Sequence, residues 1–586
     1  MRQRKMNTQS ITAFMPYLRQ FHLQNWCALL LGMISGIASV LLTYAIGQII
    51  DLMQAAGKVE FQLMYRAIGY FILLVVVNVL GQYFIQRIGN RVAYLSVANL
   101  RKDAFKHLNQ LPVSYYDRTP HGNIMSRFTN DMDNISAAIQ AIYTQVFSGG
   151  TIVVISLGMM FYLNIWLTLV VLIATPIIVM SSWVVAKLSQ KNFVAQQSIL
   201  GDMSSFITEM VGNQKIVKAF QHETINQQKF EEMNQILYVK GKNAQFSSAI
   251  ANPLSRFVDH LAYVAVGCVG GILAIKHPEL VSIGTVSSFT IYSSQFSKPF
   301  IELTGLTTQI QSAMAGMERT IDLLAQKPIH EKITQELPKV KGEVVFDQVH
   351  FSYVPTQPLI ENFNFTAKPG QTIAIVGKTG AGKSTLVNLL MRFYEVNAGK
   401  ILIDGVDIAN VSRDQLRKNF GMVLQDTWIF DSTLRENLAY GRPDASDEEI
   451  YEALKKSYMY DFVARLPQKL DTQLGEKNLK ISDGQRQLLT IARTMISNPP
   501  ILILDEATSS VDALTERKIQ DAFLAMMKGK TSFVIAHRLS TIQAADQILV
   551  MDHGHIVEMG THHQLLKQNG YYAKLYHAQF TQTSEQ

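Results

Sequence analysis

Residues 377–384 carry the clearest chemistry in the sequence. They read GKTGAGKS, which fits the pattern G-x-x-x-x-G-K-[ST], and they lie between a strand-like run and a helix-like run. Glycines at such a bend let backbone N–H groups surround phosphate oxygens. Lys383 would reach the terminal phosphates, and the Ser384 hydroxyl would bind magnesium at the positive end of the helix. A glycine-rich turn without a ligand is the alternative, but strand, loop and helix all agree with a phosphate site. The residues expected to bind nucleotide here are Gly377, Lys378, Thr379, Gly380, Ala381, Gly382, Lys383, Ser384 and Thr385.

An acidic pair ends a second apolar run. The stretch ILILDEATSS places Asp505 and Glu506 directly after residues typical of a buried strand. The first acid is placed to hold magnesium, directly or through water, and the second to orient the water that attacks a phosphoryl group. A solvent-facing strand end would look similar. Together with the phosphate loop, the pair favours nucleotide hydrolysis.

Strand-like and helix-like runs alternate around both motifs. The runs TIAIVG, KSTLVNLLMRFY, PILILDEA and TSFVIAH follow one another after the alternating stretch GEVVFDQVHFSYV. Such alternation predicts an α/β domain with a mainly parallel sheet. We expect this domain at residues 341–586, after a polar linker at residues 326–340.

The N-terminal part differs in kind, because long apolar runs recur in it. A run of about 20 apolar residues is long enough to cross roughly 30 Å of hydrocarbon as a helix. Residues 1–325 are therefore expected to form an all-helical membrane domain. Its six expected spans are residues 26–50, 67–88, 138–162, 164–186, 248–275 and 283–306. The last span is the weakest because it is rich in Ser and Thr.

Basic residues indicate the orientation of these spans. Lys and Arg are concentrated before the first span and after the second, whereas the links after spans one, three and five are short and less basic. This bias places both termini in the cytoplasm. It also accounts for the net charge of +7, so little is left to support nucleic-acid binding. Cys27 and Cys268 fall inside spans, which predicts small packing residues and no disulfide framework.

Two cytoplasmic connections, residues 89–137 and 187–247, are far longer than turns between neighbouring helices. Each has a helical pattern with a short interruption, PVSYYDRTPHGN in the first and EMVGNQKIVKAF in the second. Helices that extend beyond the bilayer must meet a surface there. The α/β domain is the candidate surface in this chain.

Three further motifs complete an ordered set: Gln425 in GMVLQDTWIF, the phrase ISDGQRQLLTIARTM, and His537 in FVIAHRLS. With them the chain resembles, over nearly its whole length, the ATP-binding cassette (ABC) transporters. The resemblance is to exporter half-transporters, in which six spans precede one nucleotide-binding domain. It implies a six-helix, all-α transmembrane domain followed by an α/β P-loop nucleotide-binding domain. It also implies ATP and Mg²⁺ as cofactors and an ATPase coupled to transport.

The resemblance implies roles for single residues. Tyr353, in FSYV, resembles the aromatic residue that stacks on adenine, and Asp512, in SSVD, matches the loop between two nucleotide sites. Glu506 resembles the catalytic base, His537 the histidine that contacts the γ-phosphate, and Gln425 the glutamine that senses magnesium and faces the membrane domain. An edge-strand tyrosine and a structural histidine are the alternatives at Tyr353 and His537. The implied metal ligands are Ser384, Gln425 and Asp505.

The residues Ser482, Asp483, Gly484 and Gln485 resemble the family's signature phrase, typically LSGGQ. In the family this phrase caps the γ-phosphate of ATP held by the opposing subunit, and Asp483 replaces a glycine of it. A carboxylate ~4–5 Å from that phosphate would be repelled by roughly 3–4 kcal/mol at an effective dielectric near 20, before any counter-ion acts. This favours a heterodimer with one competent and one degenerate ATP site. The alternative is a homodimer in which Asp483 caps the helix that starts near Gln485 and turns away from the nucleotide.

The sixth span places four aromatic residues on one helical face, where they line a cavity or pack between helices. They are Phe289, Tyr292, Phe296 and Phe300. Five charged or ionisable residues lie within spans five and six and should face protein or water. They are Arg256, Asp259, His260, Lys298 and Glu302. An ion pair between Lys298 and Glu302 is the favoured account of those two residues.

The resemblance implies ATP-driven export of amphipathic compounds, with multidrug efflux as the expected role. A lipid or peptide exporter, possibly homodimeric, is the alternative, and an ATP-gated channel or receptor could share the architecture. The expected partners are a second half-transporter chain, an amphipathic small molecule and membrane lipid, with no nucleic acid. The expected location is the plasma membrane of a bacterium.

Overall fold

The computed structural model describes residues 2–53, 60–278, 281–331, 333–378, 380–425, 427–475, 478–505, 512–536 and 538–580. The chain divides into two compact units. The first comprises Met1–Gln110 and Thr119–Lys327, and the second comprises Leu111–Arg118 and Pro328–Gln586. A short cytoplasmic segment between the second and third expected spans therefore groups with the C-terminal unit.

The first unit consists of helices. The longest ones are far longer than a bilayer requires, so they extend beyond it, as the long connections predict. The helices are α1 (Arg2–Arg19), α2 (His22–Asp51), α3 (Phe61–Leu108), α5 (His121–Phe128), α6 (Asn130–Ile142), a π-helical turn (Tyr143–Ser148), α7 (Gly149–Leu163), α8 (Ile165–Gly212), α9 (Gln214–Ala219), α10 (Glu223–Lys276) and α11 (Ile283–Leu324).

Four stretches among the described residues are long and apolar enough to cross a membrane. They are His22–Asp51, Phe61–Leu108, His121–Leu163 and Arg256–Lys276. A shorter apolar stretch, Ile165–Ser181, opens α8 where the fourth span is expected. The sixth expected span lies in α11, a helix that does not reach that hydropathy because of its hydroxyl residues. Some of those hydroxyls bond within the helix, as when Ser297 donates to the Ser293 carbonyl at 2.9 Å.

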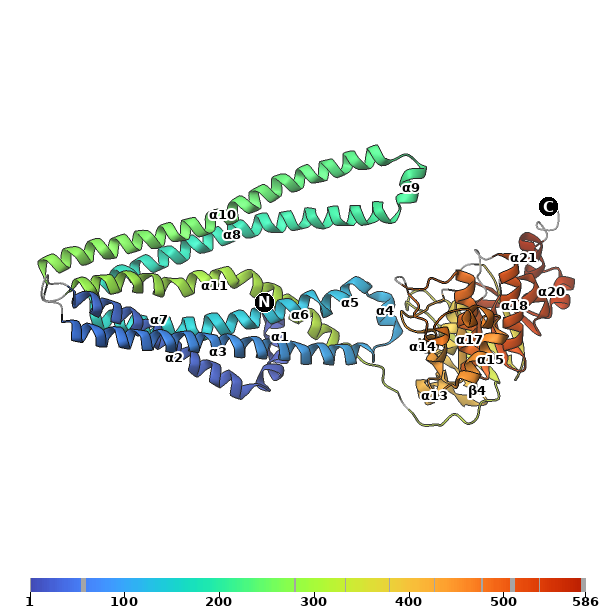
Figure 1. Ribbon diagram of the computed structural model, residues 1–586. Coiled ribbons are helices and arrows are strands. Elements are labelled where there is room, and N and C mark those ends of the chain that lie inside the picture. The colour runs from blue at the N-terminus through green and yellow to red at the C-terminus, as the bar shows by residue number, and fades with distance from the viewer. Residues whose placement is uncertain are drawn as a thin grey trace. The chain divides into compact units, whose positions relative to one another are not determined.

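The helices α8 and α10 run side by side to a tip formed by α9, as Figure 1 shows. The tip corresponds to the interruption predicted in EMVGNQKIVKAF. Its apolar side chains are exposed in the single chain: Val211 is 69%, Ile216 57% and Phe220 73% accessible.

The helices α2 and α11 approach each other very closely near the ends that face away from the cytoplasm in the predicted topology. A Cβ atom on Gly284 would lie 2.0 Å from the Gly47 carbonyl oxygen, so this crossing requires glycine. Asp51, at the end of α2, accepts hydrogen bonds from Gly284 N at 2.8 Å and from the Ser282 hydroxyl at 2.6 Å. Ser282 is also the N-cap of α11. The first and sixth spans are therefore fastened together at this end.

An ion pair with a buried carboxylate connects α6 to the C-terminal part of α11. Asp131 is 2% exposed and receives two hydrogen bonds from Arg319, Nε to Oδ2 at 2.9 Å and Nη2 to Oδ1 at 2.5 Å. The two-point geometry fixes the guanidinium plane against the carboxylate. This pair therefore fixes the C-terminal part of α11 against α6.

Both cysteines differ from the prediction. Cys27 and Cys268 are free thiols, as expected, but both are exposed in the single chain. They are therefore not packing residues within this chain. Their small apolar side chains lie on the outer faces of α2 and α10, where lipid or a second chain would cover them.

The second unit contains two sheets. A six-stranded sheet has the order β10-β9-β3-β8-β7-β6, parallel except for β10, and a four-stranded antiparallel sheet has the order β2-β1-β4-β5. The strands are β1 (Val344–Phe351), β2 (Ile360–Ala367), β3 (Thr372–Val376), β4 (Ala398–Ile403), β5 (Val406–Asp407), β6 (Phe420–Val423), β7 (Ile501–Asp505), β8 (Thr531–Ile535), β9 (Gln547–Asp552) and β10 (His555–Gly560). The mainly parallel sheet confirms the predicted α/β domain.

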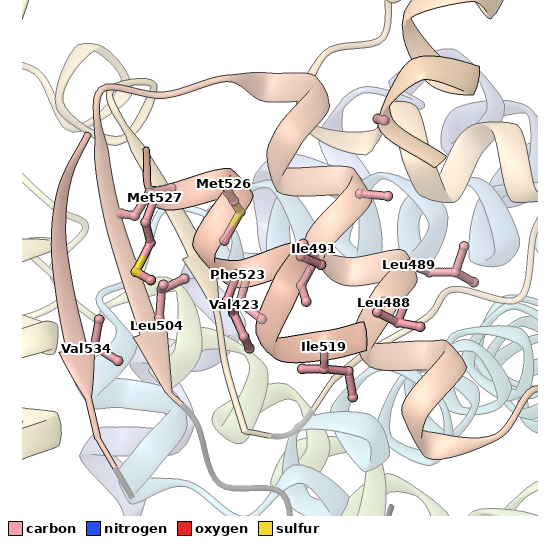
Figure 2. Close-up of a cluster of buried hydrophobic side chains, with 14 of the residues drawn as sticks. Val423, Leu488, Leu489, Ile491, Leu504, Ile519, Phe523, Met526, Met527 and Val534 are labelled. Carbon is pink, nitrogen blue, oxygen red and sulfur yellow. The ribbon is translucent and has the colours of Figure 1, made fainter. Parts of the chain in front are cut away.

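Helices cover the parallel sheet and enclose an apolar core. Figure 2 shows part of it, where Leu488 and Ile491 of one helix and Phe523 of another lie beside the strand residues Val423 and Leu504. The helices of this unit are α4 (Val113–Arg118), α12 (Lys383–Leu390), α13 (Arg413–Arg417), α14 (Leu434–Leu438), α15 (Asp447–Lys456), α16 (Tyr460–Ala464), α17 (Asp483–Ser497), α18 (Ala513–Met527), α19 (Leu539–Ala544), α20 (His562–Gln568) and α21 (Tyr571–Phe580).

Candidate functional site

The phosphate loop has the predicted strand–loop–helix form, between β3 and α12. Gly377 has φ +157° and packs so tightly that a Cβ would lie 2.3 Å from the Met551 carbonyl oxygen. Gly382 is the N-cap of α12 with φ +96°, a conformation that favours glycine. The glycines thus turn the backbone directly into the helix N-terminus, where free N–H groups and the helix dipole attract an anion.

Lys383 lies across this loop. Its Nζ donates to the carbonyl oxygens of Gly377 at 2.7 Å and Lys378 at 3.0 Å. Burial lowers the pKa of the Lys383 ammonium below its usual value, and the Asp505 carboxylate opposes that shift. The amine is therefore held at the mouth of the loop, close to an acid, as a terminal-phosphate ligand requires.

The strand ends bring the second group of predicted residues to the same edge. In the parallel order β3-β8-β7-β6, Asp505 ends β7 and lies opposite Ile535 of β8, while Gln425 follows β6 and is exposed. Ligands of open α/β sheets bind at this carboxyl edge. The structure therefore places the phosphate loop, Asp505 and Gln425 around one edge. Thr379, Glu506 and His537 lie outside the described residues, and their predicted roles stay predictions.

Tyr353 lies beside α12. Its hydroxyl donates to Thr385 Oγ1 at 3.4 Å and accepts from Asn388 Nδ2 at 3.1 Å. The ring is half-buried and contacts those of Phe351 and Tyr394 edge-on, with centroids 4.8 and 4.9 Å apart. An aromatic ring fixed next to the phosphate loop suits the predicted stacking on a base.

The short helix α4 contacts the same aromatic group. Arg118 Nη2 donates to the Tyr353 carbonyl at 3.3 Å, and the Tyr394 hydroxyl donates to the Asp117 carboxylate. Burial, and then the bond to Asp117, raise the pKa of Tyr394 above its usual value. A segment from between the second and third expected spans thus bonds to the backbone of the predicted adenine-stacking residue. Sequence analysis missed Asp117, Arg118 and Tyr394.

The signature phrase begins α17, and Asp483 does not cap it. The N-cap is Ser482, which forms a capping box: Ser482 Oγ accepts from Gln485 N at 3.3 Å and Gln485 Oε1 accepts from Ser482 N at 3.0 Å. The alternative in which Asp483 caps a helix starting near Gln485 is therefore wrong, because the helix starts at Asp483 itself. Gly484 is buried at the next position.

The Asp483 side chain is exposed and has a counter-ion. It is 70% exposed and lies 3.4 Å from Arg486 Nη2, one helical turn further on. Both features weaken the repulsion calculated for a bare carboxylate next to phosphate. Arg486 was not among the predicted site residues. Its position three residues after Asp483 in DGQR is nevertheless the spacing of a helical ion pair. A cavity of about 340 Å³ adjoins this region, lined in part by Trp428, Leu479 and Arg486.

Asp512 is the N-cap of α18. Its carboxylate accepts hydrogen bonds from Leu514 N at 3.1 Å and Thr515 N at 3.0 Å, and these bonds hold the pKa of Asp512 below its usual value. The residue matching the loop between nucleotide sites is therefore ionised and fixes the start of a helix.

The aromatic face of α11 packs inside the membrane unit. Phe289 and Tyr292 are fully buried and Phe296 is 5% exposed, in a cluster with residues of α2, α7, α8 and α10, and Phe300 packs against it. The Tyr292 hydroxyl donates to the Val40 carbonyl at 2.9 Å. These aromatics pack between helices, which was one of the two interpretations of their spacing.

The opposite side of α11 is polar. Lys298 is 72% exposed at its side chain and lies 3.9 Å from Glu302, the ion pair expected from sequence. Ser294 is exposed on the same face, and its hydroxyl donates to Asp259 of α10 at 3.2 Å. Arg256 and His260 of α10 are exposed in the single chain.

Comparisons with known proteins agree over most of the chain. The family model described as ABC transporter transmembrane region matches residues 26–300, and the ABC transporter model matches residues 360–509. The fatty acid ABC transporter ATP-binding/permease protein of Mycobacterium bovis is 40% identical over 517 residues, which cover 88% of this chain and 82% of that protein.

Two further similarities extend this result. The ATP-dependent lipid A-core flippase of Haemophilus influenzae is 36% identical over 522 residues, which cover 88% of each chain. The structure of a bacterial Atm1-family ABC exporter with ATP bound superposes with a TM-score of 0.74 at 27% identity, over 96% of this chain and 98% of that one.

Proposed function

The chain belongs to the ABC transporter family, as an exporter half-transporter whose ATPase is coupled to transport, and we propose that its cargo is a lipid-like amphipathic molecule. The observation that carries this proposal is the similarity to lipid transporters over most of the chain. The relative from M. bovis is named for fatty acids and the relative from H. influenzae for lipid A-core. These names favour the lipid alternative over multidrug efflux.

The membrane unit supports a cargo with one polar and one apolar end. Asp259, Ser294 and Lys298 form a polar stripe on α10 and α11, within otherwise apolar helices. Ionisable groups at this depth are costly unless they face water, protein or a polar ligand. A headgroup would satisfy them, while acyl chains would lie against the surrounding apolar side chains.

We propose that ATP is bound between β3 and α12. The backbone amides at the start of α12 hold the phosphates, Lys383 leaves the carbonyls of Gly377 and Lys378 to bind the terminal phosphate, and Tyr353 stacks on the base. Glu506 is the proposed base that orients the attacking water, and His537 the proposed γ-phosphate contact. ATP binds more tightly to the closed arrangement of two ATP-binding units than to the open one, and this difference in affinity shifts the transporter between states.

The donor set at the sheet edge fits Mg²⁺. The Ser384 hydroxyl, the Asp505 carboxylate and the Gln425 amide oxygen are the hard oxygen ligands that this ion prefers, and few protein ligands are needed because phosphates and water supply the rest. The nearness of Asp505 to Lys383, seen in the opposed effect on the lysine pKa, supports this fit. When bound, Mg²⁺ neutralises developing phosphate charge.

The second half-transporter chain is required for a complete transporter. The exposed apolar tip at α9, with Ile216 and Phe220, is a surface that we expect an ATP-binding unit of the assembly to cover. Ser482, Gly484 and Gln485 are proposed to cap the nucleotide of the opposing chain. Both termini are proposed to be cytoplasmic, and the membrane to be a bacterial plasma membrane.

The heterodimer with a degenerate site stays a prediction that rests on Asp483. Its exposed position and its ion pair with Arg486 reduce the reason to expect a defect. Purification of the chain alone tests it: a stable homodimer with brisk ATPase activity would remove the need for a different partner.

The cargo is tested in vesicles of phosphatidylethanolamine and phosphatidylglycerol that contain the purified transporter. We expect ATP to move a fluorescent phospholipid or fatty acid between leaflets, measured by dithionite quenching, and to leave a cationic DNA dye in place. Lys383→Ala is the inactive control, and Asp414→Asn, in an exposed ion pair with Lys418, is the neutral one. Transport of the dye without lipid movement would restore the multidrug prediction.

A further inference from the structure

We propose that Arg413 is a positioning residue for ATP hydrolysis, through which the linker that follows α11 acts on the phosphate-binding helix α12. Nucleotide contacts lie at the N-terminus of α12, whereas Arg413 acts at its C-terminus. The proposal depends on the ATPase and not on the identity of the cargo.

The C-terminus of α12 is built around a buried arginine. Arg392 follows the helix with φ +50°, and its side chain is 5% exposed. Its Nη1 donates to the carbonyls of Ile408 at 2.9 Å and Val411 at 2.7 Å, and its Nε donates to Glu395 Oε1 at 2.9 Å. The chain after the helix is thus held in a conformation that non-glycine residues adopt only when such bonds fix it.

Two further arginines bond to the last carbonyls of this turn. Arg417 Nε donates to the Met391 carbonyl at 3.1 Å and its Nη2 to the Arg392 carbonyl at 3.2 Å. Arg413 Nε donates to the same Arg392 carbonyl at 3.4 Å, and its Nη2 donates to Glu395. Cations at the negative end of a helix stabilise it, so this cluster fixes where α12 ends.

The linker reaches the cluster through Glu331. Glu331 Oε1 accepts from the backbone N of Arg413 at 3.1 Å and from its Nη1 at 3.3 Å, and Arg413 is only 12% exposed. A few residues later the backbone N–H groups of Thr334 and Gln335 donate to the Asn410 carbonyl at 2.9 and 3.2 Å. Since α11 ends at Leu324, Glu331 follows within about two helical turns' number of residues after the helix that holds the sixth expected span.

Charge makes the linker part of the cluster. Arg392 and Arg413 both pair with Glu395, and Arg413 also pairs with Glu331. Burial and the neighbouring guanidinium groups lower the pKa of Arg417, and Glu331 opposes that change. Withdrawal of Glu331 would therefore increase repulsion among the arginines behind the helix.

Helix α12 is short enough that a shift at its C-terminus would also move its N-terminus, where the phosphates are proposed to bind. The helix has eight residues, about 12 Å from end to end, and it begins with Lys383 and Ser384. A packed helix moves as a body, so a change at Met391 and Arg392 shifts the loop that holds the phosphates. Movement of the sixth span is thus transmitted along the chain to the nucleotide, and binding of nucleotide must act back on the linker by the same amount.

The test compares Glu331→Gln with Asp414→Asn, which removes a neighbouring carboxylate that pairs with the exposed Lys418. We expect Glu331→Gln to raise the ATP concentration for half-maximal hydrolysis about fivefold, with kcat changed less than about twofold. Glu331→Asp, which keeps the charge, should recover most of the difference, and Asp414→Asn should match the wild type.

Hydrogen exchange supplies a readout that needs no turnover. The Mg²⁺ salt of a non-hydrolysable ATP analogue should slow exchange of the Thr334 and Gln335 amides in the wild type, and much less in Glu331→Gln. The proposal is overturned if the analogue leaves these amides unchanged, or if Glu331→Gln and Asp414→Asn have the same ATP dependence. Failure of lipid transport in vesicles would leave both results intact.

Discussion

Removal of a single hydroxyl at Tyr394 should weaken the contact between α4 and the nucleotide site. Tyr394→Phe keeps the aromatic ring, whose centroid lies 4.9 Å from that of the Tyr353 ring, and removes the hydroxyl that donates to the Asp117 carboxylate. The other bond of α4, from Arg118 to the Tyr353 carbonyl, stays in place. The substitution therefore tests the attachment of the membrane loop without altering the aromatic stack.

The magnitude follows from the kind of bond that is lost. A hydrogen bond to a charged acceptor contributes about 1.5–3 kcal/mol when buried, but this one is exposed, so water replaces much of it and about 1 kcal/mol is a reasonable loss. A change of about 1 kcal/mol corresponds to roughly a fivefold shift between attached and detached α4. Removing the Arg118 bond as well, in Tyr394→Phe with Arg118→Gln, should add a similar amount.

The assay is the ratio of lipid molecules moved to ATP hydrolysed, in the vesicles described above. We expect Tyr394→Phe to lower this ratio by about two- to fivefold and the double variant to lower it further, while ATPase without cargo changes little. Tyr458→Phe, at an exposed tyrosine elsewhere in the same unit, is the matched control.

A double variant that moves as much lipid per ATP as the wild type would show that α4 does not transmit motion through this contact. A loss of ATPase in proportion to transport would also contradict the reasoning, because it would mean that the hydroxyl supports the ATP site itself.

Four other predictions follow from single contacts. Lys383→Ala should reduce ATP hydrolysis by more than about tenfold, because the terminal phosphate loses its cation, and a phosphate-release assay measures this. Asp131→Ala should lower the free energy of unfolding by about 1–3 kcal/mol in detergent, since it leaves the half-exposed Arg319 without its buried partner. Gly284→Ala should lower Tm, because its Cβ would lie 2.0 Å from the Gly47 oxygen, whereas Gly158→Ala, where a Cβ meets open space, should not. The pKa of Asp512 is lower in the folded protein than the unfolded value of about 3.9, so its carboxylate stabilises α18 above that value. This stabilisation is lost as the pH falls through the folded pKa. Asp512→Asn cannot titrate, so hydrogen exchange of α18 should depend less on pH below about pH 4 in this variant than in the wild type.

Features that depend on neighbouring residues were predictable from the sequence. The phosphate loop requires glycines, a lysine and a following helix within one short segment, so residues 377–384 define it locally. The mainly parallel sheet and the long apolar helices follow from patterns repeated over whole elements. The sheet and the helices were confirmed, and phosphate binding by residues 377–384 stays a prediction.

Features that depend on distant residues were not predictable. The bond from Arg118 to Tyr353 joins positions 235 residues apart, and that between Glu331 and Arg413 joins positions 82 apart. Neither pair carries a local pattern, since surface charges are common in loops and linkers. Only the fold brings them together.

The predicted start of helix α17 near Gln485, with Asp483 as its N-cap, was wrong for a physical reason. Serine and aspartate are both good N-caps, so ISDGQ permits a helix beginning at either residue. The glutamine three residues after Ser482 completes a capping box with it, and this reciprocal pair decides the register. Aspartate then occupies the first turn, where a negative charge is also favourable.

The bare tip at α9 has a consequence for how the cell makes this protein. In the predicted topology, a newly inserted chain that has not met its partner displays Val211, Ile216 and Phe220 to the cytosol, where chaperones and proteases recognise such surfaces. An unmatched copy would therefore be short-lived, so the amount of finished transporter depends on how quickly two chains meet after insertion.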